Sequence, residues 1–156
     1  MFNRIFPRQF DNDYRGNRLA IWLLIPIVIG RLAMGTNTII NTRMVATSAD
    51  GIPLDSFGAG GAETVIALFA LYGLFVLLFA LQGVVVLIRY RSMIPFMYLL
   101  LLLQQVGGKM LILVHPLART GIPSARLGSA FILAILAMTL IGFVLSLLRK
   151  PASPNS

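Results

Sequence analysis

The sequence predicts an all-α membrane protein in which four transmembrane helices form an antiparallel bundle. Of its 156 residues, 58% are apolar and only 12% are charged, which leaves too little charge for the surface of a soluble domain. Four apolar segments follow one another along the chain. Each is close to the length of about 20 residues that a helix needs to cross a bilayer.

The first predicted span covers about residues 19–40 and contains a cation, Arg31. The stretch 19–30 is too short to cross a bilayer, so the span has to include Arg31. A cation near the bilayer centre costs about 2.5–3.5 kcal/mol on insertion scales. From this depth the side chain cannot reach either interface, and we therefore expect it to face protein and not lipid.

Three further spans are expected at about residues 64–88, 93–114 and 127–148. The third is interrupted by the polar run 104–109, which reads Gln-Gln-Val-Gly-Gly-Lys. The fourth carries small residues at three- and four-residue spacing, a pattern that predicts a helix–helix contact. These small residues are Ala130, Ala134 and Ala137.

The distribution of Lys and Arg predicts that both termini are cytoplasmic, with the connections 44–62 and 115–126 outside. The domain plan is a cytoplasmic or interfacial tail (1–18), a transmembrane domain (19–148) and a cytoplasmic tail (149–156). We expect a multi-pass protein of the cell (inner) membrane. Outside the spans, eight basic residues then lie on the cytoplasmic side: Arg4, Arg8, Arg15, Arg18, Arg89, Arg91, Arg149 and Lys150. Three lie on the opposite side: Arg43, Arg119 and Arg126.

This arrangement also explains the net charge of +8. Basic residues at span ends attract anionic lipid head groups and fix orientation. No nucleic-acid motif accompanies the charge, so nucleic acid is not an expected partner. The expected partner is the lipid bilayer, and whether the chain forms a homo-oligomer or joins a larger membrane complex stays open.

Depth along the helices predicts a polar cluster in the outer half of the bundle. At 1.5 Å per residue, Arg31 lies about 18 Å from the cytoplasmic start of its span, and Gln104 about 17 Å from the start of the third span. Neighbouring positions extend the cluster along the same helix faces, and an acidic residue at the outer mouth is the nearest counter-charge. The candidate ligand-binding or polar intramembrane cluster is Arg31, Thr38, Gln104, Gln105, Lys109 and Glu63.

The cluster also has a purely structural interpretation. Glutamines commonly connect helices by hydrogen bonds within membranes, and Lys109 is long enough to extend toward the interface. Arg31 is the residue for which a structural role is least expected, because of its depth.

Three function classes follow from these residues. An intramembrane enzyme is least expected, since the chain has no Cys, one His and no acid at depth; no catalytic residue, metal site or cofactor is expected. The sequence favours a non-catalytic accessory, assembly or scaffold subunit. The alternative is a carrier or binding protein for an anionic or lipid-like small molecule that uses Arg31 and Lys109.

Overall fold

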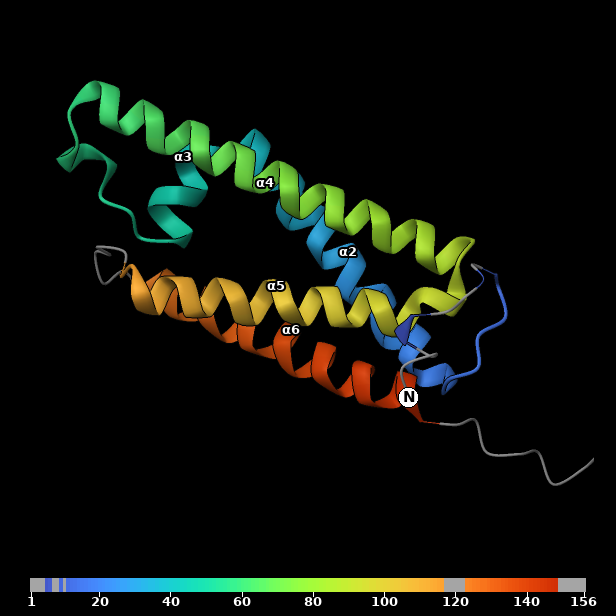
Figure 1. Cartoon of the computed structure of the whole chain (residues 1–156). Helices are drawn as coiled ribbons and strands as arrows, with labels where there is room; N and C mark the ends of the chain where they lie inside the picture. The colour runs from blue at the N-terminus through green and yellow to red at the C-terminus, as the bar shows by residue number, and fades with distance from the viewer. Residues whose placement is uncertain (1–4, 7–8, 10, 117–122, 149–156) are drawn as a thin grey trace, which may run out of the picture.

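The computed structural model describes residues 5, 6, 9, 11–116 and 123–148, and within this part the chain forms helices and no strands (Figure 1). Three helices are long and apolar enough to cross a membrane: α2 (Arg18–Ile40), α4 (Ala59–Ile88) and α5 (Ile94–Val114). The fourth, α6 (Pro123–Leu147), contains a shorter apolar stretch, Ile132–Leu147.

The connection predicted over residues 44–62 contains more helix than expected. After α2 come a short α3 (Thr42–Met44), a π-helical segment η1 (Val45–Ala49) and a 3₁₀ turn η2 (Leu54–Ser56), and α4 begins five residues before position 64. The reason is a small apolar core at this end of the molecule. Its buried members are Ala46, Ile52 and Leu54, and Val65, Ile66 and Phe69 of α4 pack against them.

The other helix boundaries lie close to the predicted ones. α2 begins after Asn17, whose side-chain oxygen accepts a hydrogen bond from the backbone N–H of Leu19 at 3.0 Å. This is the usual way to satisfy a free N–H at a helix start. The α4–α5 connection is the 3₁₀ turn η3 (Arg91–Met93), and α5 begins with Pro95 in its first turn, where a missing N–H costs nothing.

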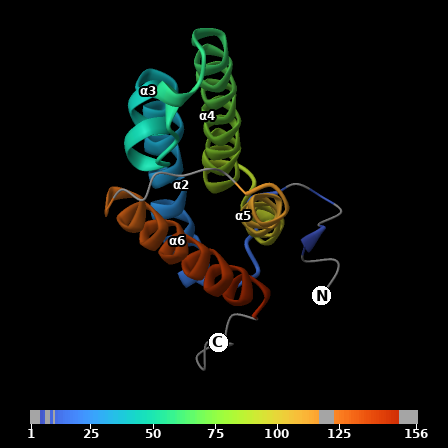
Figure 2. The same ribbon diagram turned by 90° about the vertical axis from the view of Figure 1, so that its left-hand side faces the viewer.

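α2 is the central helix of the molecule. It packs against α4 over much of its length and against α6, and α6 also packs against α5, whereas α4 and α5 contact each other little. Figure 2 shows α2 between α4 and α6, and Figure 1 shows that consecutive long helices run in opposite directions. The limited contact between α4 and α5 leaves space for a cavity.

Glycines let α2 and α4 approach closely. A Cβ atom added to Gly35 would lie 2.8 Å from the backbone N of Leu77, which is closer than real contacts allow. On α4, a Cβ at Gly83 would lie 2.6 Å from a methyl group of Val28. Small residues at such positions are what permits tight packing between apolar helices.

The prediction that the fourth helix packs against another helix through its alanines is wrong. Ala130, Ala134 and Ala137 are exposed. The hydroxyls of Thr139 and Ser146 donate to backbone carbonyls one turn earlier on their own helix, each at 2.6 Å, so these polar residues can be buried at the contact without unpaired donors. The buried face of α6 is formed by Ile135, Thr139, Gly142 and Ser146.

Three chain segments meet at the end of the molecule where α2 begins. The backbone and hydroxyl of Ser92, in the α4–α5 turn, both hydrogen-bond to the backbone of Asp11. The N–H of Asn17 donates to the carbonyl of Leu145 in α6 at 3.4 Å. Tyr14 is half-buried beside this contact, and desolvation raises the pKa of its phenol. Residues 1–4, 7, 8 and 10 of the predicted N-terminal tail and the whole predicted C-terminal tail, 149–156, lie outside the described residues.

Candidate functional site

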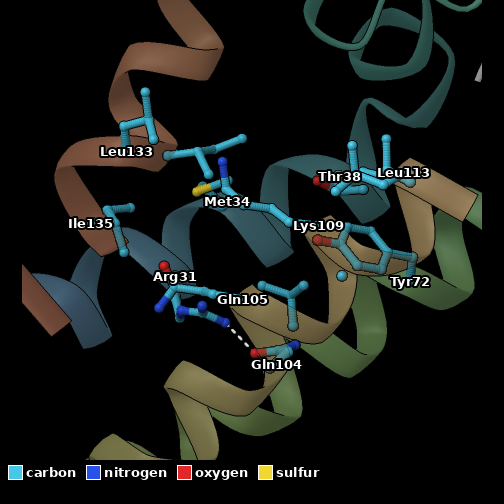
Figure 3. Close-up of a pocket in the computed structure, with 14 residues that line it drawn as sticks. Arg31, Met34, Thr38, Tyr72, Gln104, Gln105, Lys109, Leu113, Leu133 and Ile135 are labelled. Carbon is cyan, nitrogen blue, oxygen red and sulfur yellow. Dashed lines mark hydrogen bonds between the residues drawn. The ribbon is translucent and has the colours of Figure 1, made fainter. Parts of the chain in front are cut away.

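A cavity of about 530 Å³ lies between the helices, in the half of the molecule away from the α4–α5 turn (Figure 3). All four long helices contribute to its wall. The lining residues are Arg31, Met34 and Thr38 of α2, Tyr72 and Val76 of α4, Gln104, Gln105, Gly108, Lys109, Ile112 and Leu113 of α5, and Ile132, Leu133 and Ile135 of α6.

Arg31 is the most unusual residue of the wall. Its side chain is only 8% exposed, and its Nη1 donates a hydrogen bond to Oε1 of Gln104 on α5. The contact predicted between Arg31 and a glutamine of the third span is therefore confirmed. Nε of Arg31 is buried without a hydrogen-bond partner, and an amide oxygen cannot neutralise a full positive charge. The guanidinium is thus held inside the molecule, and its hydrogen-bond partner among the described residues does not neutralise its charge.

Gln105 connects α5 to α6. Its Nε2 donates to the carbonyl of Leu101 at 3.2 Å and to Oγ1 of Thr139 at 3.1 Å. Because the Thr139 hydroxyl donates its own proton to the carbonyl of Ile135, it can only accept from Gln105. The amide is therefore fixed in one orientation, with Oε1 buried and without a partner. For Gln105 the structural interpretation describes the observed contacts well.

Lys109 and Thr38 also line the cavity, as their helix positions predicted. Lys109 is exposed, and it follows Gln105 by one turn of α5. Thr38 is buried on α2, two turns beyond Arg31. The two cations therefore belong to one cavity, one buried and the other at its edge.

Glu63 does not belong to this wall. Because α4 begins at Ala59, Glu63 lies in its second turn, where it is exposed, and it is not among the residues that line the cavity. Among the described residues, no Asp or Glu lines the cavity. The counter-charge expected from Glu63 is thus missing from the position where Arg31 would need it.

Sequence reasoning missed Tyr72, which contributes the one phenol of the wall. It lies within the second predicted span, for which the sequence predicted no member of the polar cluster. Its distance from the end of α4 at Ile88 is about 24 Å at 1.5 Å per residue, only a few ångströms beyond the level of Arg31. The depth comparison that grouped Arg31 with Gln104 would have included Tyr72 if it had been applied to every polar atom.

The described residues include no group of three or more His, Cys, Asp and Glu side chains that could hold a metal ion. No family model, curated protein or solved structure matches this chain. The cavity and the charge of its wall are therefore the features of this chain that bear on its function.

Proposed function

We propose that this chain is a multi-pass membrane protein that binds a small anionic or lipid-like molecule in the cavity between its helices. One observation carries the proposal: two cationic side chains, Arg31 and Lys109, line a mainly apolar cavity to which no described carboxylate contributes. Arginine stays charged inside proteins, so burial cannot be relieved by loss of a proton. An anionic ligand supplies the missing charge and accepts charge-assisted hydrogen bonds from the guanidinium.

The proposal of a membrane location is supported by where the apolar side chains lie. Of the most apolar part of α4, only 17% is buried inside the molecule, and large residues such as Leu68, Tyr72 and Phe75 are exposed. A helix that is hydrophobic on all sides needs an apolar surrounding, and lipid provides it. We propose an antiparallel bundle of four spans in this surrounding.

An accessory or scaffold subunit was the function favoured by the sequence, and it stays a prediction. In such a protein the polar groups only need to connect helices, as Gln105 does with Thr139. Arg31 fits this role poorly, because a buried charge without a neutralising partner costs free energy that an apolar side chain would not. The cavity beside Arg31 is what favours ligand binding over a scaffold role.

The proposed orientation, with both termini in the cytoplasm, is tested by cysteine labelling. The natural chain has no cysteine, so single substitutions give an unambiguous signal. Asn12→Cys and Asp55→Cys each place a thiol at an exposed position, near opposite ends of the molecule. A membrane-impermeant maleimide added to intact cells should label only Asp55→Cys. Labelling of Asn12→Cys alone would reverse the proposed orientation.

Anion binding is tested with butyl phosphate as a water-soluble probe, titrated calorimetrically into the purified protein in a neutral detergent. We expect one molecule to bind per chain, with butanol as the uncharged control that does not bind. Lys109→Met should weaken binding about 3- to 10-fold, since an exposed cation contributes on the order of 1 kcal/mol. Arg91→Met removes the same charge at the far end of the molecule and should leave binding unchanged.

Two results of this titration would contradict the proposal. If the wild-type chain does not bind butyl phosphate, the cavity is not an anion site. If Arg91→Met weakens binding as much as Lys109→Met, the attraction comes from the overall positive charge and not from the cavity.

A further inference from the structure

We propose that the ligand is a single-chain amphiphile, with a carboxylate or phosphate-monoester head group, that enters the cavity sideways from the surrounding lipid. This inference rests on the proposed function, which requires only that an anion binds. It adds two claims: the ligand carries one alkyl chain, and that chain leaves the cavity past α6.

The edge of the cavity, like its interior, is lined mainly by apolar side chains. Met34 of α2, Ile112 and Leu113 of α5 and Ile132 and Leu133 of α6 line the cavity and are exposed on the outside of the molecule. Figure 3 shows Leu133 and Met34 on the same side of the cavity, near Lys109. An opening with such an edge suits a ligand that is already dissolved in lipid, because the exposed apolar side chains contact its chain directly.

The depth of the side chains sets the orientation of the ligand. Lys109 lies five residues from the end of α5, or about 7.5 Å, which is the level of lipid head groups and upper chains. Leu133 lies six residues inside the fourth predicted span, which begins at about residue 127, or about 9 Å from its outer end and close to the level of Lys109. A head group held between Lys109 and Arg31 would therefore lie at a level from which its chain passes Leu133 into the surrounding lipid.

The volume of the cavity limits the ligand to one chain. A cavity of about 530 Å³ corresponds to about 18 times the volume that a water molecule takes up in the liquid, roughly 30 Å³. A methylene group is of similar size, so the space accommodates a small head group and about a dozen carbons. It also falls in the range of roughly 300–1,000 Å³ that is usual for a single small ligand. Two acyl chains of a membrane phospholipid do not fit inside together, and a second chain would have to stay in the surrounding lipid.

Gly108 keeps this space open. It lines the cavity, and a Cβ atom added to it would meet no atom within 4 Å. Glycine in the interior of a helix is less stable than alanine. Packing against another helix does not require a glycine at this position. Gly107 provides a matched comparison, because a Cβ there also meets nothing within 4 Å but the residue does not line the cavity.

The experiment compares Gly108→Leu with Gly107→Leu in nanodiscs of phosphatidylcholine. Equal amounts of a monoacyl glycerol phosphate, a diacyl glycerol phosphate and palmitate are added, and bound lipid is counted by native mass spectrometry. The wild type should retain one monoacyl phosphate or palmitate in preference to the diacyl lipid by at least tenfold. Gly108→Leu should lose at least nine-tenths of the bound single-chain lipid, and Gly107→Leu should retain it.

A photoreactive diazirine near the end of the palmitate chain tests the exit past α6. Crosslinks in the wild type should concentrate on peptides that contain Ile132 and Leu133. Crosslinks spread evenly over the lipid-facing side chains of α4 would overturn the proposed path. So would equal binding of single-chain lipid by Gly108→Leu and wild type.

Failure of this inference can be distinguished from failure of the proposed function. If butyl phosphate binds the wild type and long-chain lipids do not compete with it, the cavity binds a free anion and the single-chain lipid is wrong. If neither butyl phosphate nor any of the lipids binds, the anion site itself is absent and both proposals fall.

Discussion

Arg31→Leu is expected to abolish binding of the anionic ligand and to leave the protein at least as stable in detergent as the wild type. Loss of one partner from a desolvated, hydrogen-bonded charge pair costs about 2–5 kcal/mol in binding, or roughly 30-fold to several thousand-fold in affinity. Without ligand, the buried guanidinium has one hydrogen bond, to Gln104, and no neutralising group among the described residues. Replacement of such a charge by an apolar side chain is often neutral or stabilising.

The measurement pairs calorimetric binding of butyl phosphate with thermal unfolding of the same ligand-free sample. Arg43→Leu is the matched control, because Arg43 is an exposed arginine near the same end of the molecule and pairs with Asp55 at 3.6 Å. It should change neither property appreciably. Arg31→Lys, which keeps the charge and loses the planar fork, should bind with an intermediate affinity.

An unstable Arg31→Leu chain would assign the arginine a structural role instead. The decisive comparison is then Arg31→Gln, which keeps a donor for Gln104 without the charge. If Arg31→Gln restores stability and still binds butyl phosphate like the wild type, Arg31 connects helices and does not bind the anion.

Gly142→Val is expected to produce the largest loss of stability among single substitutions on α6. A Cβ atom at this position would lie 2.3 Å from Cζ of Tyr98, a distance that real contacts do not reach. Tyr98 cannot move aside cheaply, because its side chain is fully buried and its hydroxyl donates to the carbonyl of Ala20 at 2.7 Å. Such overpacking costs about 1–3 kcal/mol, and displacement of Tyr98 would also break its hydrogen bond to Ala20 of α2.

The control for this variant is Ala134→Val, on the exposed face of the same helix. Thermal unfolding in a neutral detergent should show a midpoint several degrees lower for Gly142→Val and little change for Ala134→Val. Equal destabilisation by the two variants would mean that α6 packs through its alanines, as the spacing of small residues had suggested.

Sequence reasoning predicted the features that depend on position along a helix axis. A helix rises 1.5 Å per residue whatever surrounds it, so the distance from a span end is enough to compare levels between helices. The division into helices follows from the four apolar segments, and the level shared by Arg31 and Gln104 follows from counting residues. The hydrogen bond between these two side chains is consistent with this shared level.

Only the tertiary structure decided which side of each helix faces the others. These helices are apolar on nearly every side, so their sequences contain little information on which side is buried. The face of α6 was therefore predicted wrongly from Ala134, because spacing identifies small residues without showing which of them has a partner. Tyr98 makes Gly142 the necessary small residue, and that relation exists only when α5 and α6 are in contact.

The same limit applies to the cavity. The sequence alone determined an apolar helical chain with a cation, Arg31, at a depth where it predicts no acidic side chain. The tertiary structure decided that Lys109, Tyr72 and Gly108 share one space with it and that Glu63, in the second turn of an α4 that is longer than predicted, does not. The physical reason is that a rise of 1.5 Å per residue is fixed by the backbone, whereas the rotation of each helix about its axis is fixed by the side chains of its neighbours.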